Sequence, residues 1–98
     1  MGAQFKSRDA TAKAFVEKKA YQGGAAMFSN GRDVYSYGDH FMMAEWRDDG
    51  SIGVNEASYS RTTAQHKGSV KRALQSAGFA PTEELYRGYG GYHYRVWR

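Results

Sequence analysis

Three glycine-containing dipeptides limit how the first half of this chain can fold. Asn30-Gly31, Gly38-Asp39 and Asp49-Gly50 punctuate a stretch between residues 25 and 59 that is rich in tyrosine, valine, phenylalanine and tryptophan. Residues of these types favour strands, and glycine supplies the positive φ that tight hairpin turns require. The pattern predicts an antiparallel meander with strands at approximately 25–29, 32–37, 40–46 and 51–55.

A first helix is predicted before the meander. Asp9 or Ser7 can cap it, because the side-chain oxygen of either residue can accept from the free N–H groups of an opening helical turn. We expect the helix to continue to about Ala20 and to end at Gly23-Gly24. Its apolar stripe consists of Ala12, Phe15, Val16 and Ala20.

A second helix is predicted after the meander. Thr62 or Thr63 can cap it, and it should end near Ala77, because Gly78 suits a left-handed cap and Pro81 cannot continue a helix. One narrow face of this helix is expected to pack on the sheet, and the basic side to face solvent. Helical spacing places on the packed face Thr63, His66, Val70, Ala73, Leu74 and Ala77, and turns elsewhere Lys67, Lys71, Arg72 and Gln75.

A closing strand is predicted at residues 92–97. Tyr92, Tyr94 and Val96 alternate with His93, Arg95 and Trp97, which indicates one buried and one partly exposed face. The whole order predicts an α+β fold: an antiparallel β-meander with a closing C-terminal strand and two helices packed on one face. The chain of 98 residues fits a single domain spanning 1–98.

The composition favours a cytoplasmic protein. The chain has no cysteine, which excludes disulfides and thiolate metal sites, and we expect no cofactor and no bound metal. No stretch approaches the ~20 apolar residues of a membrane span, so we expect no membrane partner. The first residues lack an apolar signal core, and Lys6 stands where the myristoylation pattern requires Ser or Thr.

Positive charge is concentrated in the last part of the chain. Residues 1–60 carry seven Lys and Arg against eight Asp and Glu, whereas residues 61–98 carry seven against two. This asymmetry favours an acidic partner, either nucleic acid or an acidic protein, over a neutral small substrate. The alternative is a solvated basic helix face that serves solubility.

Two short segments resemble a known family. They are Tyr35-Ser36-Tyr37-Gly38-Asp39-His40-Phe41 and Thr62-Thr63-Ala64-Gln65-His66. The pair is similar to segments of a family of small uncharacterised domains carried by phages and mobile elements, with departures at Met42, where the family has Pro, and at Ala64, where it has Ser. The resemblance implies a phage-type setting. It implies no mechanism, because the family has no assigned function.

His40 and His66 are the sharpest candidates for chemistry, since each lies in one of these segments. Pointing into a common crevice, they could act as an acid–base pair or bind a metal together with Asp39. The alternative, which we favour, is that His66 is an interior imidazole bonded to a sheet tyrosine or a backbone carbonyl. It would then fix the helix against the hairpin of residues 35–41.

Tyr35 and Tyr37 raise a similar choice. Alternation places both on one face of their strand, opposite Val34 and Ser36. Exposed rings on a sheet can stack against unpaired bases, whereas buried rings are ordinary core. No RNA-recognition motif accompanies them, so core packing is the interpretation that we favour.

The C-terminal stretch interleaves aromatic, basic and glycine residues more densely than any other part, which is typical of nucleic-acid contacts and protein interfaces. The alternative is a flexible loop at Gly88 to Gly91 followed by a strand that completes the sheet. The predicted binding residues of this stretch and of the second helix are Lys67, Lys71, Arg72, Arg87, Tyr89, Arg95, Trp97 and Arg98.

Three functions compete on this sequence. The first is a non-enzymatic module that engages nucleic acid or a nucleoprotein complex through the basic, aromatic-rich C-terminal surface. The second is a phage-encoded inhibitor of a host protein or defence complex. The third, which we favour least, is a small hydrolase that uses His40 and His66. No phosphate-binding loop or nucleophile elbow is present in the sequence.

Overall fold

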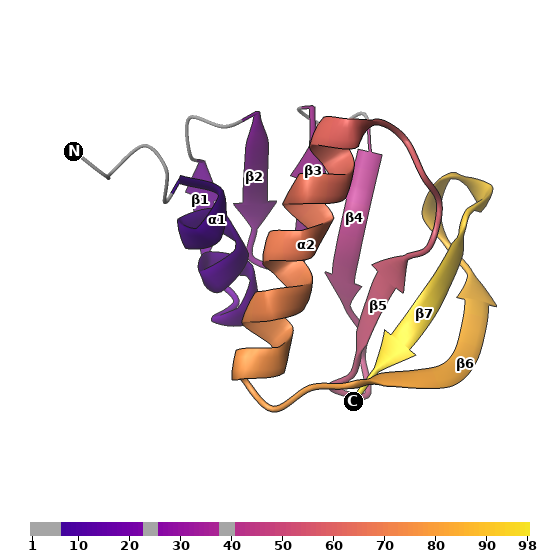
Figure 1. Ribbon diagram of the computed structural model, residues 1–98. Coiled ribbons are helices and arrows are strands. Elements are labelled where there is room, and N and C mark those ends of the chain that lie inside the picture. The colour runs from indigo at the N-terminus through magenta and orange to yellow at the C-terminus, as the bar shows by residue number, and fades with distance from the viewer. Residues whose placement is uncertain (1–6, 23–25, 38–40) are drawn as a thin grey trace.

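The computed structural model describes residues 7–22, 26–37 and 41–98 (Figure 1). The predicted helix end at Gly23-Gly24, the predicted turn at Gly38-Asp39 and the candidate His40 lie outside the described residues. Within the described residues, the α-helices are α1 (Ser7–Val16) and α2 (Arg61–Ser76). The strands are β1 (Ala20–Gln22), β2 (Met27–Asn30), β3 (Asp33–Ser36), β4 (Phe41–Trp46), β5 (Ile52–Asn55), β6 (Pro81–Arg87) and β7 (His93–Trp97).

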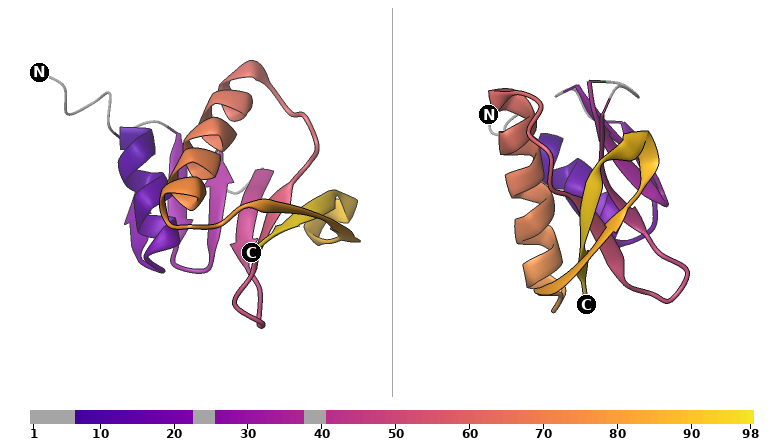
Figure 2. Two further views of the ribbon diagram at one scale, coloured as in Figure 1. Left: turned by 60° about the horizontal axis from the view of Figure 1, so that its bottom comes forward. Right: turned by 90° about the vertical axis from the view of Figure 1, so that its right-hand side faces the viewer.

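The strands form one antiparallel sheet in the order β1-β2-β3-β4-β5-β7-β6. Strands β1 to β5 are the meander, β7 pairs with β5, and β6 forms the edge. Both helices cover the same face of the sheet, and the β6–β7 hairpin curls away from the plane of β2 to β4 (Figure 1, Figure 2). The predicted α+β class, with a meander, a closing C-terminal strand and two helices on one face, is confirmed.

The hydrophobic core lies between the helices and the sheet. α1 contributes Ala12 and Phe15, and α2 contributes Val70 and Leu74, all of them at most 1% exposed. Trp46 of β4 donates from Nε1 to the carbonyl oxygen of Phe15 at 2.8 Å and so ties α1 to the sheet. In the described part of the chain, no helix is long and apolar enough to span a bilayer. The sheet contributes to the core Met27, Val34, Phe41, Met43, Ala44, Ile52, Val54 and Trp97.

α1 is shorter than predicted, and the expectation that it continues to Ala20 is wrong. The helix ends at Val16, and Lys18 adopts a positive φ of 62°. The N–H of Lys19 donates to the carbonyl of Ala14 at 2.8 Å, and the N–H of Lys18 to that of Phe15 at 3.0 Å. This pair of bonds satisfies the last carbonyls of the helix and turns the chain, so that Ala20 already begins β1.

α2 begins earlier than the predicted caps. Ser60, not Thr62 or Thr63, is the N-cap, and its Oγ accepts from the N–H of Thr63 at 3.1 Å. The helix ends as predicted: Gly78 has a φ of 94°, and the N–H of Phe79 donates to the carbonyl of Leu74 at 2.9 Å. The packed face is confirmed for most of its residues, although Ala77 is exposed.

Strand β6 was not expected from the sequence, and the predicted loop at residues 88–91 contains a 3₁₀ turn at Tyr89–Gly91. β6 is exposed along most of its length and pairs with β7 through residues 85–87 and Pro81. Its side chains show no alternation of apolar and polar types. A strand held chiefly by its hydrogen bonds to a neighbour carries little periodic signal in the sequence.

Tyr86 anchors β6 by crossing the sheet over Gly53 of β5. Its Oη donates to Glu45 of β4 at 2.6 Å, and its ring stacks on Tyr94 with centroids 5.5 Å apart. The guanidinium of Arg47 lies 4.4 Å from the ring centroid. Burial, together with the carboxylate of Glu45, raises the pKa of Tyr86, so the phenol remains a donor. Gly53 makes this crossing possible, because a Cβ at that position would overlap the phenol oxygen.

We expect Gly53→Ala to lower the free energy of unfolding by about 1–3 kcal/mol, because the added methyl group must displace Tyr86. Gly68→Ala in α2 is the control. Its Cβ would lie 3.4 Å from Nη1 of Arg72, which is an ordinary contact, and removing glycine from a helix should stabilise it by up to about 1 kcal/mol. Denaturant unfolding of both variants measures the difference. Equal stability of the two variants would contradict the crossing.

Candidate functional site

The two family-like segments meet in the folded chain. Ser36 ends β3, and His66 and Thr63 lie on the packed face of α2. Ser36 Oγ is 2.8 Å from His66 Nδ1 and 3.1 Å from Thr63 Oγ1. All three side chains are buried, at 0% exposure for Ser36, 3% for His66 and 1% for Thr63. This contact joins the helix to the sheet through side chains from both segments.

The contact extends toward the surface through further hydroxyl groups. Ser60 Oγ lies 3.1 Å from Thr63 Oγ1 and 3.5 Å from Tyr37 Oη. Hydrogen bonds from the Ser60 side chain, and secondarily from Thr62, lower the pKa of Tyr37. A line of hydroxyl groups therefore runs from His66 to Tyr37 beside the N-terminus of α2.

The environment of His66 suits a neutral imidazole. Burial lowers its pKa, and the positive charge of Arg8 lowers it further. From the sequence we expected His66 to bond to a tyrosine or a backbone carbonyl. Its Nδ1 contacts the hydroxyl group of Ser36 instead, so the expected partner was wrong. Among the described residues, no cluster of three or more His, Cys, Asp and Glu side chains could hold a metal.

Tyr35 and Tyr37 do not share one face as predicted. Tyr35 stacks on Phe28 with centroids 5.0 Å apart and an interplanar angle of 12°. Tyr37 lies beyond the end of β3 with a φ of 60°, and its hydroxyl is near Ser60. A left-handed residue interrupts the alternation of a strand, so Tyr37 turns toward α2 like Ser36.

A cavity of about 470 Å³ lies between α2 and the loop that precedes it. Lys67 Nζ donates to the carbonyl oxygen of Ala57 at 2.9 Å, so this ammonium group is held in the wall of the cavity. Burial, and then the neighbouring charge of Lys71, lowers the pKa of Lys67. The lining of the cavity consists of Ala57, Ser58, Tyr59, Ser60, Thr63, Ala64, Lys67, Gly68 and Lys71.

The exposed side of α2 is positively charged. The helix carries four cationic side chains and no carboxylate, at positions Arg61, Lys67, Lys71 and Arg72. Arg72 is 3.8 Å from Asp9 of α1, and both side chains are at least 60% exposed, so their attraction is weakened by solvent. Within the described residues, Arg61 and Lys71 form no ion pair. The predicted basic helix face is present, with Lys67 partly buried.

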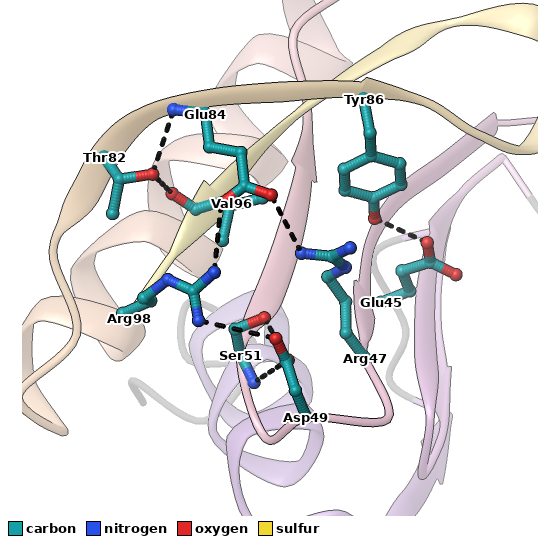
Figure 3. Close-up of polar contacts among 9 residues, drawn as sticks. All are labelled: Glu45, Arg47, Asp49, Ser51, Thr82, Glu84, Tyr86, Val96 and Arg98. Atoms are coloured by element: carbon teal, nitrogen blue, oxygen red, sulfur yellow. Dashed lines mark hydrogen bonds and ion pairs between the residues drawn. The ribbon is translucent and has the colours of Figure 1, made fainter.

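Ion pairs occupy two of the predicted C-terminal binding residues. Arg98 lies 3.0 Å from Glu84 and 3.4 Å from Asp49 (Figure 3). Arg95 lies 3.1 Å from Glu56 and also donates to a backbone carbonyl of β6 at 2.8 Å. The charges of Arg95 and Arg98 are therefore largely balanced by acids brought from other parts of the chain.

Trp97 was expected to be available to a partner, and this expectation is wrong. The side chain is 3% exposed and belongs to the hydrophobic core. Trp97 pairs with Ile52 across β5 and β7, and Ile52 is itself fully buried. The end of β7 is therefore part of the interior and offers no aromatic surface.

Arg87 and Tyr89 remain exposed at the far end of the β6–β7 hairpin, with Tyr89 61% exposed. This end lies beside the loop that forms the cavity, because the N–H of Glu56 donates to the carbonyl of His93 at 2.9 Å. The two segments can be followed side by side at the right of Figure 1. The structure thus brings Arg87 and Tyr89 close to the loop that precedes α2, whereas Arg98 is held in ion pairs and Trp97 is buried in the core.

Tyr59 was missed by the sequence analysis. Its side chain is 51% exposed, and its ring stacks on the buried Phe41 with centroids 5.0 Å apart and an interplanar angle of 25°. Ser60, which was also missed, is as good a cap as threonine. The sequence signal for both residues was the pair Tyr59-Ser60 shortly before Thr62-Thr63. Nothing in the neighbouring sequence distinguishes this pair from ordinary loop residues.

Comparison of this chain with protein-family models, curated proteins and solved structures finds no significant match.

We expect Ser36→Ala to lower the free energy of unfolding by about 1–3 kcal/mol, because it leaves His66 and Thr63 buried without their shared partner. Ser58→Ala is the matched control, since Ser58 is exposed and its replacement should change stability by no more than about 0.5 kcal/mol. Thermal and denaturant unfolding check both. A Ser36→Ala protein as stable as the control would show that this contact does not hold the helix.

The stability of the protein should also fall in mild acid because of His66. An unfolded histidine titrates near 6.5 and the folded pKa of His66 is lower, so the unfolded chain binds more protons in this range. The free energy of unfolding therefore decreases as the pH falls through 6.5 and below. His66→Gln should make the free energy of unfolding less dependent on pH between about pH 7.5 and 5, as denaturant unfolding at several pH values would measure. Hydrogen bonds from Ser51 lower the pKa of Asp49 to about 2. The contribution of Asp49 to the free energy of unfolding is therefore lost only at more acid pH.

Proposed function

We propose that this protein is a non-enzymatic binding module that engages nucleic acid, or a nucleoprotein complex through its nucleic acid. The observation that carries the proposal is the charge of α2, which has four cationic side chains, Lys67 among them partly buried, and no carboxylate. Phosphate groups are the anions that such a row of charges attracts, and each contact releases counterions. The main contact surface is therefore α2, and not the C-terminal strand.

The exposed end of the β6–β7 hairpin extends this surface. Arg87 forms no ion pair with any residue that the structure describes, and Tyr89 offers an exposed ring at the same end. The loop before α2 lies between this end and the helix. An elongated ligand such as a nucleic-acid strand could contact both, whereas a small substrate could not.

A hydrolytic function receives less support. Ser36 and His66 contact each other, but both are almost completely buried, so no substrate reaches the pair without a rearrangement. A buried, hydrogen-bonded pair is what a structural link between helix and sheet requires. The phage-type setting and the cytoplasmic location remain expectations from the sequence.

One observation favours a second candidate function, an inhibitor of a host protein. β6 is an edge strand, and in the described part of the chain only β7 pairs with it. An open edge can accept a strand of another protein. Glu83, which is exposed on this edge, would direct it toward a basic partner. A stoichiometric complex that survives nuclease treatment of a lysate would support this candidate over the first.

We expect the affinity for nucleic acid to depend steeply on salt, and the slope to be set by α2. Arg61→Gln with Lys71→Gln should weaken binding and reduce the slope of log K against log salt by about 2, because two phosphates are no longer neutralised. Fluorescence anisotropy with labelled oligonucleotides at several salt concentrations measures both quantities.

The matched control is Arg32→Gln with Lys19→Gln, which removes the same charge from side chains that are 62% and 71% exposed near β1 and β2. Lys19 precedes β1 and Arg32 lies in the turn between β2 and β3, so neither belongs to α2 and the control should keep the wild-type slope. The proposal fails when both double variants weaken binding equally, since only net charge would then matter, or when the wild-type protein binds no nucleic acid.

A further inference from the structure

The cavity between α2 and the preceding loop combines a positive wall with an exposed ring. We propose that it receives one unpaired nucleotide of a single-stranded nucleic acid, with the phosphate at Lys67 and Lys71 and the base against Tyr59. This inference rests on the proposed function and narrows the ligand to single-stranded nucleic acid. A cavity of about 470 Å³ lies within the size range of known ligand sites.

The charge of the cavity favours a phosphate. Lys67 and Lys71 are one helical turn apart and both line it, and the lining residues that the structure describes include no carboxylate. Lys67 uses one N–H on the carbonyl of Ala57, and an ammonium group has three, so donors remain for a ligand. The hydroxyl group of Ser58 adds a neutral donor. A bound anion would relieve the repulsion between the two lysines.

Tyr59 is held in place for stacking. One face of its ring rests on Phe41, which is fully buried, and Tyr37 supports it with centroids 5.8 Å apart. About half of the side chain, 51%, is nevertheless exposed. A ring that is already fixed loses little conformational freedom when a base stacks on it, and such stacking tolerates any base.

This arrangement discriminates between single strands and duplexes. In a duplex the bases are paired and stacked inside the helix, so only phosphates would meet the protein and Tyr59 would contribute nothing. In a single strand a base can turn out and cover the ring while its phosphate remains at the lysines. The predicted preference is therefore for unpaired nucleotides, independent of sequence.

Anisotropy measurements with a labelled oligonucleotide of about 12 nucleotides, single-stranded and as a duplex of the same sequence, test the inference. Tyr59→Leu keeps an apolar side chain over Phe41 but removes the stacking ring, whereas Tyr59→Phe keeps the ring. We expect Tyr59→Leu to weaken single-strand binding about tenfold or more and duplex binding by less than about twofold. Tyr59→Phe should bind as the wild type does.

Tyr21→Leu is the control, since Tyr21 is an exposed tyrosine, at 42%, on β1 away from α2. Melting curves confirm that each variant is folded. Competition by a free mononucleotide at low concentration would overturn the assignment to a strand and make the site one for a soluble nucleotide.

Two results separate this inference from the proposed function. When Tyr59→Leu weakens single-strand and duplex binding equally, or weakens neither, the cavity is not a nucleotide site, while the α2 charge variants still report nucleic-acid binding. Failure of the wild-type protein to bind any oligonucleotide overturns both.

Discussion

The buried contact of Ser36 with His66 and Thr63 is the interaction on which the arrangement of this molecule depends. Apolar contacts such as those of Val70 and Leu74 tolerate small shifts of a helix, because the hydrophobic effect is not directional. Buried polar groups do not, since each must keep its partner or bear the full cost of desolvation. The contact therefore fixes how α2 is rotated on the sheet, and with it the side of α2 that faces solvent.

That rotation determines where the positive charge of the chain becomes available. The cations of α2 lie off the buried face that carries the polar contact, and the loop before the helix closes over Lys67 to form the cavity. The line of hydroxyl groups from His66 to Ser60 ends in the same cavity wall. One network of hydrogen-bonded side chains thus supports both the helix and the candidate site.

Local signals in the sequence were sufficient for most elements but not for their ends. The turn at Asn30-Gly31, the positive φ of Gly78 and the apolar period of α2 are set within a few residues, and each was predicted correctly. α1 ends earlier than predicted because Lys18 adopts a left-handed conformation. Lysine rarely adopts this conformation, so the residue type gives no sign of it in the sequence. β6 could not be foreseen, because its partner β7 and the crossing of Tyr86 over Gly53 are tertiary features.

The sequence by itself determined the fold class, the packed face of α2 and the presence of a basic C-terminal part. Only the tertiary structure decided which of those charges are balanced. Arg98 is paired with Asp49, 49 residues earlier, and Arg95 with Glu56, 39 residues earlier, whereas Lys71 forms no ion pair among the described residues. The physical reason is range: helix periodicity and turn preference act between near neighbours, but the field at a side chain depends on whichever distant groups the fold places against it.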